Sequence, residues 1–318
     1  MDINGITDIA RYLTDEEAAQ NALAQLRWPN GVECPLCDGG KKVYEVKYTH
    51  IDSRTGEVKP TVRKQWKCGA CRKKFSVTSR SIFEGAHIPV GKWIYAIFLM
   101  CSSKKGVSAN QLSRELNVSY KSAWFMCHRV REAMLQEPLR GMLGGGKYSV
   151  VELDETFVGG KPKNNRHANR TSAAGKKTAV MTLLDRRGDV KTVVVPDTRM
   201  GTLQELAKPI VHPETTVMTD QHASYYGLHE HFTDHFTVNH NKEFVRGVIH
   251  TNFAESYHSL LKRGIVGAFH HVSEKHLSRY LAEFDRRWNT RKDRDGVRTT
   301  NVLRSAQGKR LRYKEVIA

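Results

Sequence analysis

The chain has 318 residues, and its 51 lysines and arginines outnumber 33 aspartates and glutamates to give a formal net charge of +18. This basic excess favours a polyanionic partner such as nucleic acid, because basic side chains release counterions from a phosphate backbone. An anionic membrane surface is less favoured, since the sequence has no long apolar run and no amphipathic basic tail. The first 20 residues are polar and acidic without a secretory signal, so we expect a cytoplasmic, nucleoid-associated protein whose six cysteines are free or metal-bound.

The first 30 residues are expected to form a helical segment. A short amphipathic helix is predicted over residues 5–28, with Thr14 and Asp15 as a cap-like pair within it. The run WPNG at residues 28–31 ends this helix in a turn, because proline and glycine interrupt helices.

Two Cys-x-x-Cys pairs define the next module, residues 31–80. Four thiolates on two tight turns can bind one Zn²⁺ tetrahedrally, and the intervening β-like runs at residues 42–51 and 61–67 are typical of a zinc ribbon. A redox pair or chance spacing is the alternative. Four thiolates leave no open coordination position, so we expect a structural zinc site in a DNA-binding or partner-binding domain. The ligands are Cys34, Cys37, Cys68 and Cys71, and the basic residues expected to face phosphates are Arg63, Lys64, Lys67, Arg72, Lys73 and Lys74.

Residues 88–138 are predicted to be helical. A buried helix follows Pro89, and Ser108 and Ser119 are placed to cap two further helices separated by a short turn. Helix, short turn and helix together indicate a helix-turn-helix DNA-binding domain, with an ordinary helical hairpin as the alternative. Cys101 and Cys127 lie among apolar residues and are expected to be core thiols. The second helix would offer Tyr120, Lys121, Ser122 and Arg129 to a DNA groove. Residues 139–146 are glycine-rich and are predicted to be a linker.

The next segments alternate as strands and carry acids near their ends. Residues 148–157 predict a strand with Asp154, and residues 215–220 predict a strand that ends at Asp220. Between them, residues 179–184 and 190–195 form a predicted hairpin, and residues 203–210 a short helix. A salt bridge at the strand end and a helix N-cap are the alternatives for Asp154 and Asp220. Glu152 and Glu155 are expected to have supporting roles, the stretch after Asp220 is helix-like, and Lys161 and Lys163 belong to a basic loop expected to meet nucleic acid.

A helix over residues 252–263 carries the third acid. Its predicted apolar stripe contains Phe253, Tyr257, Leu260 and Leu261, and its polar face contains Glu255, Ser259 and Lys262. A solvated face with a charge pair is the alternative. The order of strand, two strands, helix, strand and helix is that of the ribonuclease-H-like fold, which we expect over residues 147–292. The fold class is thus multidomain α+β or α/β: zinc ribbon, helix-turn-helix and a mixed-sheet catalytic domain.

Several runs resemble the ISXO2-like insertion-sequence transposases. They are CPLC, CGAC and KKFSVTSRSIFEGAHIPVGKW in the first half, and VELDETFVGGK, VMTDQHASY, VNHNKEFV and the run over residues 250–291 in the second. The resemblance implies a D-D-E triad of Asp154, Asp220 and Glu255, with Lys262 as the associated lysine. It also implies two Mg²⁺ (or Mn²⁺) ions per active site. Some members are described with asparagine as the third residue, so Asn252 is a second candidate. His240 lies near the site in the family pattern and is expected to be structural or to contact DNA.

The predicted function is therefore that of a transposase acting on double-stranded DNA. We expect it to bind terminal inverted repeats and target DNA as a homodimer or larger oligomer, without a membrane partner, and Arg263 is a further candidate DNA contact. A catalytically silent regulator and a nuclease or resolvase of the same fold are the alternatives. Residues 274–291 are expected to form a core helix, in which Arg286 and Arg287 would meet either DNA or solvent, and residues 293–318 a basic tail.

Overall fold

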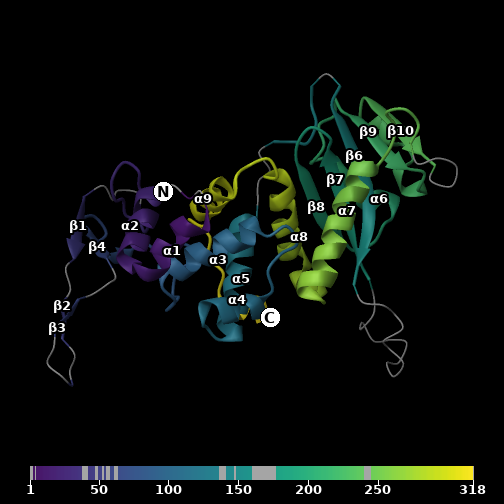
Figure 1. Cartoon of the computed structure of the whole chain (residues 1–318). Helices are drawn as coiled ribbons and strands as arrows, with labels where there is room; N and C mark the ends of the chain where they lie inside the picture. Colours follow the sequence, from purple (N-terminus) through teal and green to yellow (C-terminus); the bar gives the residue numbers. More distant parts are fainter. Residues whose placement is uncertain are drawn as a thin grey trace. The chain divides into compact units, whose positions relative to one another are not determined.

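The structure is a computed structural model that describes residues 3, 5–37, 42–46, 49–51, 54, 58–60, 64–135, 141–146, 148–159, 177–239 and 245–317. The chain divides into two compact units, shown in Figure 1. The first unit comprises Met1–Ser103, Val107–Met134 and Asp293–Ala318. The second comprises Lys104–Gly106 and Leu135–Lys292. The second unit is therefore an insertion between segments of the first.

The first unit begins with two helices, α1 (Ile6–Thr14) and α2 (Glu16–Arg27), where the sequence predicts one. Asp15 separates them, because its backbone is extended and its carboxylate accepts a hydrogen bond from the Ala18 N–H at 2.9 Å. Of the predicted cap-like pair, Asp15 caps a new helix and does not lie within one, whereas Thr14 is the last residue of α1. The prediction of a single helix is thus wrong.

The ribbon contains a small antiparallel sheet in the order β1-β4-β5, formed by β1 (Val43–Val46), β4 (Gln65–Cys68) and β5 (Lys74–Ser76). The strands β2 (Thr49–Ile51) and β3 (Val58–Pro60) form a separate antiparallel pair. Trp66 and Phe75 stack on this sheet and contact Trp28 edge-on, with ring centroids 5.4 and 6.0 Å from that of Trp28. These aromatic contacts attach the ribbon to the end of α2. Residues 61–63, which include Arg63, lie outside the described residues.

Three helices follow at the predicted positions: α3 (Val90–Ser102), α4 (Ala109–Leu116) and α5 (Tyr120–Met134). Ser108 Oγ accepts from the Gln111 N–H at 3.1 Å, and Ser119 Oγ accepts from the Ser122 N–H at 3.2 Å, so both predicted caps form. Asn117 has φ of 48°, a left-handed conformation that asparagine tolerates, and it turns the chain between α4 and α5. Cys101 and Cys127 are buried in the core, as predicted.

The C-terminal residues are folded and complete the first unit. The helices α9 (Asp295–Ser305) and α10 (Tyr313–Ile317) replace the expected basic tail. Val302 and Leu303 are fully buried in the same core as α3 and α5. The prediction of a tail depended on the basic composition of this segment, in which few side chains are apolar and buried.

The second unit contains a mixed sheet in the order β10-β9-β6-β7-β8. Among the described residues, β7 runs antiparallel to β6 and β8, while β9 and β10 run parallel to β6. This is the strand order of the ribonuclease-H-like fold that the sequence predicts. The strand β10 was not predicted, because its sequence DHFTV is short and only its last residue is buried. The strands are β6 (Val150–Val158), β7 (Thr178–Asp185), β8 (Val190–Val195), β9 (Thr216–Asp220) and β10 (Asp234–Val238).

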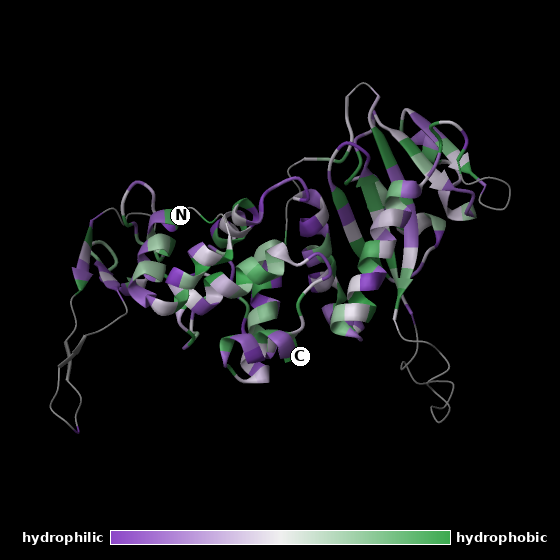
Figure 2. Cartoon of the chain, viewed as in Figure 1, coloured by the Kyte–Doolittle hydropathy of each residue, from purple (hydrophilic) through white to green (hydrophobic). Residues whose placement is uncertain are grey.

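Helices cover both faces of this sheet. On one face, α6 (Met200–Ala207) and two 3₁₀ turns, η2 (Ala223–Tyr225) and η3 (Leu228–Glu230), pack on the side chains of β6 and β7. The expected helix after Asp220 is thus a pair of 3₁₀ turns. The linker glycines adjoin this face, where Leu143 is buried in the core. Figure 2 shows the hydrophobic stretches of the central strands.

On the other face lie α7 (Asn252–Gly264) and α8 (Glu274–Asn289), joined through the π-helical turn η4 (Ile265–Phe269). The predicted stripe of α7 is partly wrong, because Phe253 is 40% exposed while Ala254 and His258 face the sheet. No helix of the described residues is long and apolar enough to cross a membrane.

Candidate catalytic and metal sites

Asp154 and Asp220 lie on adjacent parallel strands at matching positions. The register pairs Val150 with Thr216 and Glu152 with Met218, an offset of 66 residues that also separates Asp220 from Asp154. The two aspartates are therefore two residues beyond the last paired residues, Asp220 at the end of β9 and Asp154 in the middle of β6. Parallel pairing in this register explains why acids far apart in sequence become neighbours.

Electrostatic coupling links these two acids to Glu255. The pKa of the Asp154 carboxyl is raised to about 8, first by burial and then by the negative charges of Glu155, Asp220 and Glu255. Glu255 lies on the exposed side of α7, in its first turn. Among the described residues, Asp154 has no lysine or arginine ion partner. Carboxylate oxygens are the ligands that suit Mg²⁺ or Mn²⁺.

The three acids do not converge tightly in this conformation. Among the described residues, the cysteines of the ribbon are the only group of three or more candidate ligands whose atoms all lie within 4.8 Å of one another. Carboxylates repel one another unless a cation lies between them, and Glu255 is exposed enough to change rotamer. The carboxylate oxygens of the three acids therefore suit a divalent cation, although they do not all lie within contact of one point in this conformation.

Asn252 and Lys262 lie on α7 one turn before and two turns after Glu255, on its exposed side. The Asn252 N–H donates to His250 Nδ1 at 3.4 Å. The charge of Lys262 is close enough to contribute to the lowered pKa of His258. Arg263 is also exposed, and its Nε donates to the Ser259 carbonyl at 3.2 Å. The assignment of Glu255 or Asn252 as the third ligand stays a prediction.

His258 is a site residue that the sequence reasoning missed. Its Nδ1 lies 3.4 Å from Asp154 Oδ2, and its Nε2 lies 2.8 Å from Thr182 Oγ1. Burial and then the charge of Lys262 lower the pKa of His258 to about 4, so the imidazole is neutral at pH 7. If Thr182 donates to Nε2, the proton on Nδ1 faces Asp154 and orients its carboxylate. The sequence did offer one indication of this role: His258 follows Glu255 by three residues, about one helical turn.

Glu155 points to the opposite face of β6. One of its carboxylate oxygens accepts a hydrogen bond from the buried Tyr225 hydroxyl, and the other lies 3.7 Å from His222 Nδ1. Burial raises the pKa of Glu155, and burial with the nearby Glu155 charge raises that of Tyr225. The Asp220 carboxylate accepts from the His222 N–H at 3.0 Å. Glu155 thus links β6 to the segment that follows Asp220.

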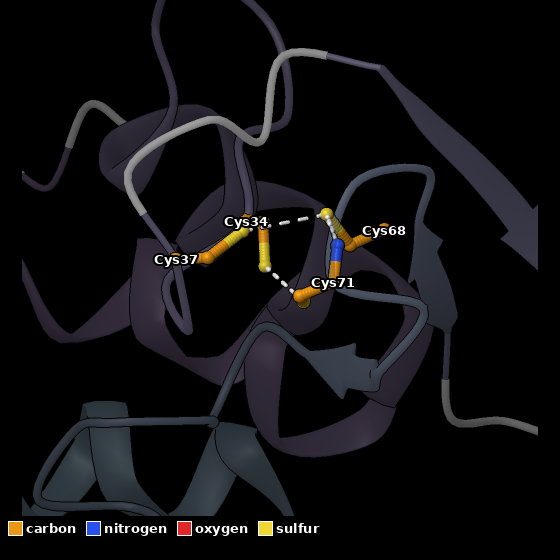
Figure 3. Close-up of side chains that lie close together, drawn as sticks. All are labelled: Cys34, Cys37, Cys68 and Cys71. Atoms are coloured by element: carbon orange, nitrogen blue, oxygen red, sulfur yellow. Dashed lines mark hydrogen bonds between the residues drawn. The ribbon is translucent and has the colours of Figure 1, made fainter.

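The four cysteines of the ribbon form the second candidate metal site (Figure 3). The Sγ atoms of Cys34 and Cys71 lie 3.8 Å apart, and those of Cys37 and Cys68 lie 3.6 Å apart. The backbone N–H of Cys71 lowers the pKa of the Cys68 thiol to about 7, which favours the thiolate that binds metal. Four sulfurs from two tight turns fit a structural Zn²⁺.

The candidate DNA contacts of α5 differ in their exposure to solvent. Tyr120 is 58% exposed, Lys121 is exposed, and Ser122 is partly exposed. Arg129 is only 6% exposed, because its guanidinium donates to the backbone carbonyls of Glu84 and Leu311 and stacks over a phenylalanine ring. Its prediction as a DNA contact is therefore wrong.

Other basic candidates are also buried or undescribed. Arg286 and Arg287 of α8 are buried, and Arg287 pairs with the buried Glu283, so neither is offered to DNA. Lys161, Lys163 and His240 lie outside the described residues.

A four-cysteine ribbon in one unit and a mixed sheet of ribonuclease-H-like order in the other define the class of this protein. The family model of the ISXO2-like transposase domain matches residues 142–289, and that of the transposase zinc-ribbon domain matches residues 14–74. The chain belongs to the ISXO2-like transposase family.

Two curated relatives agree with this assignment. An "Uncharacterized protein in transposable element ISH50" of Halobacterium salinarum is 28% identical over 291 residues, covering 87% of this chain and 92% of the relative. An "Uncharacterized transposase-like protein" of Haemophilus influenzae is 31% identical over 100 residues, covering 31% of this chain and 80% of the relative.

Two solved structures show weaker likeness. The pre-cleavage Mos1 transpososome has a TM-score of 0.26 and 15% identity, covering 65% of this chain and 76% of that chain. The Mos1 strand transfer complex has a TM-score of 0.22 and 13% identity, covering 64% and 78%. These scores are low, and the fold assignment depends on the strand order described above.

Proposed function

We propose that this protein is a DNA transposase that binds the terminal inverted repeats of an insertion sequence and catalyses metal-dependent strand cleavage and strand transfer. The observation that carries the proposal is the matching position of Asp154 and Asp220 on adjacent parallel strands, where burial and then the negative charges of Glu155, Asp220 and Glu255 raise the pKa of Asp154 to about 8. Such coupling is typical of carboxylates gathered for a shared cation. Membership of the transposase family supports the same reading.

Asp154, Asp220 and Glu255 would hold two Mg²⁺ or Mn²⁺ ions, with Asn252 as the alternative third ligand. When bound, such ions activate a water or a 3′-hydroxyl and stabilise the leaving oxygen of an in-line displacement. His258 would keep the Asp154 carboxylate oriented through its 3.4 Å contact. Lys262 would hold a phosphate near the scissile bond as a point charge, so the chain need not supply a nucleophile of its own.

DNA recognition would use both units. In the first, α4 and α5 would act as a helix-turn-helix, with Tyr120, Lys121 and Ser122 offered to the major groove. In the second, Arg263 and the basic loop with Lys161 and Lys163 would contact phosphates. The zinc ribbon would maintain the fold of the first unit. Two transposon ends must be joined, so we expect a homodimer or larger oligomer on DNA.

The test is a strand-transfer assay in Mg²⁺ or Mn²⁺ on DNA that carries the flanking inverted repeats. Wild type is compared with Glu255→Gln and Asn252→Ala, and DNA binding is measured in parallel. Loss of joined products only in the Glu255 variant is the expected result. Loss only in the Asn252 variant would move the third ligand to Asn252. Binding without cleavage by wild type would favour a silent regulator, and hydrolysis without joining would favour a nuclease.

A further inference from the structure

Glu152 is a buried carboxylate that the proposed chemistry does not use. It lies on β6 two residues before Asp154 and points to the same face, toward α7. Its side chain is fully buried in a strongly basic protein. A buried carboxylate is costly unless it is paired and hydrogen-bonded, so its partners indicate its role.

The first partner is the N-terminus of α7. Glu152 Oε2 accepts a hydrogen bond from the Ala254 N–H at 2.9 Å. The first N–H groups of a helix have no intrahelical acceptor, and Thr251, which precedes α7, makes no side-chain capping bond. Glu152 therefore caps α7 from a neighbouring strand, and its negative charge lies at the positive end of the helix dipole.

The second partner is Arg186, which follows the end of β7. Its Nε donates to Glu152 Oε1 at 2.7 Å, and its Nη1 and Nη2 donate to the carbonyls of Val248 and His250, each at 2.8 Å. Its backbone N–H donates to the Val150 carbonyl of β6 at 3.1 Å. The guanidinium thus connects Glu152 to the segment that enters α7.

These contacts connect β6, which carries Asp154, to the first turn of α7, which carries Glu255. Ala254 is the residue before Glu255, and Glu152 is two residues before Asp154, so one hydrogen bond joins the elements that carry both acids. Glu255 follows Ala254 directly in the first turn of α7, so the position of its backbone depends on how that turn is held. Buried ion pairs are often replaceable by apolar groups without loss of stability, which makes a purely stabilising role a poor explanation.

We infer that Glu152 is a positioning residue that holds the first turn of α7, and with it Glu255, in place beside Asp154. The inference rests on the proposed function only in taking Glu255 as an acid of the catalytic site. Arg186 serves the same role by holding both Glu152 and the residues before α7.

The test is amide hydrogen exchange on the metal-free, full-length protein, comparing wild type with Glu152→Gln. Ala254 and Arg186 donate to different oxygens of Glu152, and glutamine keeps the size of the side chain but replaces one oxygen by an NH₂ group, so it cannot accept at both positions. We expect the amides of residues 252–255 to exchange about tenfold faster, as on loss of a helix cap, while those of β6 and β7 keep their protection. The matched control is Glu205→Gln, which removes an exposed carboxylate paired with Lys208 and should change neither region.

Two results would overturn the inference: unchanged exchange at the start of α7, or an equal increase throughout the second unit. Arg186→Lys is the second variant, because lysine keeps the charge but lacks the guanidinium group that donates to the carbonyls of both Val248 and His250. It should speed exchange at residues 248–255 in the same selective way. Unchanged exchange at those residues in Arg186→Lys would also count against the inference.

The link to catalysis is measured separately. In single-turnover cleavage of inverted-repeat DNA, Glu152→Gln should be at least about tenfold slower than wild type, with unchanged DNA affinity. Full cleavage by a variant with a loosened α7 would overturn the positioning role. If wild type itself does not cleave, the proposed function fails, while the exchange measurement still decides whether Glu152 holds α7.

Discussion

Asp154 is buried and faces neighbouring carboxylates, and both features oppose its ionisation. Its pKa of about 8 lies above the value of about 3.9 for an unperturbed aspartate. The folded protein therefore retains a proton over a pH range in which the unfolded chain has lost it. The Glu155 N–H donates to Asp154 Oδ1 at 2.9 Å, and His258 Nδ1 lies 3.4 Å from the other carboxyl oxygen, Oδ2.

This shift predicts a stability that depends on pH. Asp154 should contribute a fall in the free energy of unfolding of the metal-free protein as pH rises from about 4 to 8, by up to about 1.4 kcal/mol per pH unit. The lowered pKa of His258 contributes a rise between about 4 and 6.5. Asp154→Asn should remove the Asp154 contribution and be more stable than wild type near pH 8, because asparagine cannot ionise. Denaturant unfolding across this range measures the slope, with Asp234→Asn, at an exposed aspartate of β10, as the control. Equal slopes for wild type and Asp154→Asn would contradict the raised pKa.

At the scale of elements, one face of α7 packs against the sheet and the other carries the candidate site residues. Tyr257 and Leu261 pack against the sheet, while Glu255 and Lys262 remain exposed. The Tyr257 hydroxyl donates to Asp285 of α8 at 2.6 Å, and Asp285 also accepts from the Thr192 N–H and hydroxyl of β8. Burial raises the pKa of Asp285 to about 6. These bonds fix α7 and α8 to the sheet.

The ribbon is the element with the least apolar core of its own, so we predict that it depends on metal. One Zn²⁺ per chain should be released by a strong chelator or lost in Cys68→Ala, and the melting temperature of the first unit should fall by roughly 2–4 °C for each kcal/mol lost. Zinc release measured with a colorimetric chelator, alongside thermal unfolding, checks this. Cys101→Ala removes a buried thiol outside the ribbon and should keep its zinc. Full stability without zinc would disprove a structural role.

At the scale of the whole molecule, the first unit is made from both ends of the chain. Lys309 Nζ donates to the Glu132 carbonyl at 3.0 Å, and Tyr313 contacts the rings of Trp124 and Phe125. The C-terminal segment therefore supports the helix that would read DNA. Removing residues 293–318 would remove part of the core of the first unit.

A substitution at Gly296 tests whether the two ends of the chain pack together in the first unit. A Cβ at Gly296 would lie 1.5 Å from the Ile3 carbonyl oxygen, so Gly296→Ala must displace the backbone. We expect a loss of about 1–3 kcal/mol in the stability of the first unit, together with weaker DNA binding. Gly201→Ala is the control: a Cβ there has open space, and alanine favours helix by up to about 1 kcal/mol. Thermal unfolding of both variants measures this, and an unaffected Gly296→Ala would show that the N-terminal residues are not packed there.

The sequence alone determined the features that depend on local spacing. The two Cys-x-x-Cys turns, the capped helices α4 and α5, and the strands β6 to β9 follow from residue spacing and periodicity, which need no knowledge of distant partners. The position of Asp220 at the end of β9 follows in the same way, whereas Asp154 lies in the middle of β6 and not near its end. The assignment of the acids to a shared metal site depends on family resemblance and stays a prediction.

Tertiary structure decided the features that depend on distant partners. Arg129 is buried because a carbonyl 182 residues away accepts its hydrogen bond, and His258 meets Thr182 across 76 residues. The strand β10 forms because β9 offers it an edge, not because its own sequence is strongly strand-like. The C-terminal helices join the first unit for the same reason: burial of a polar or basic segment is set by the groups that receive it, and local periodicity carries no information about those groups.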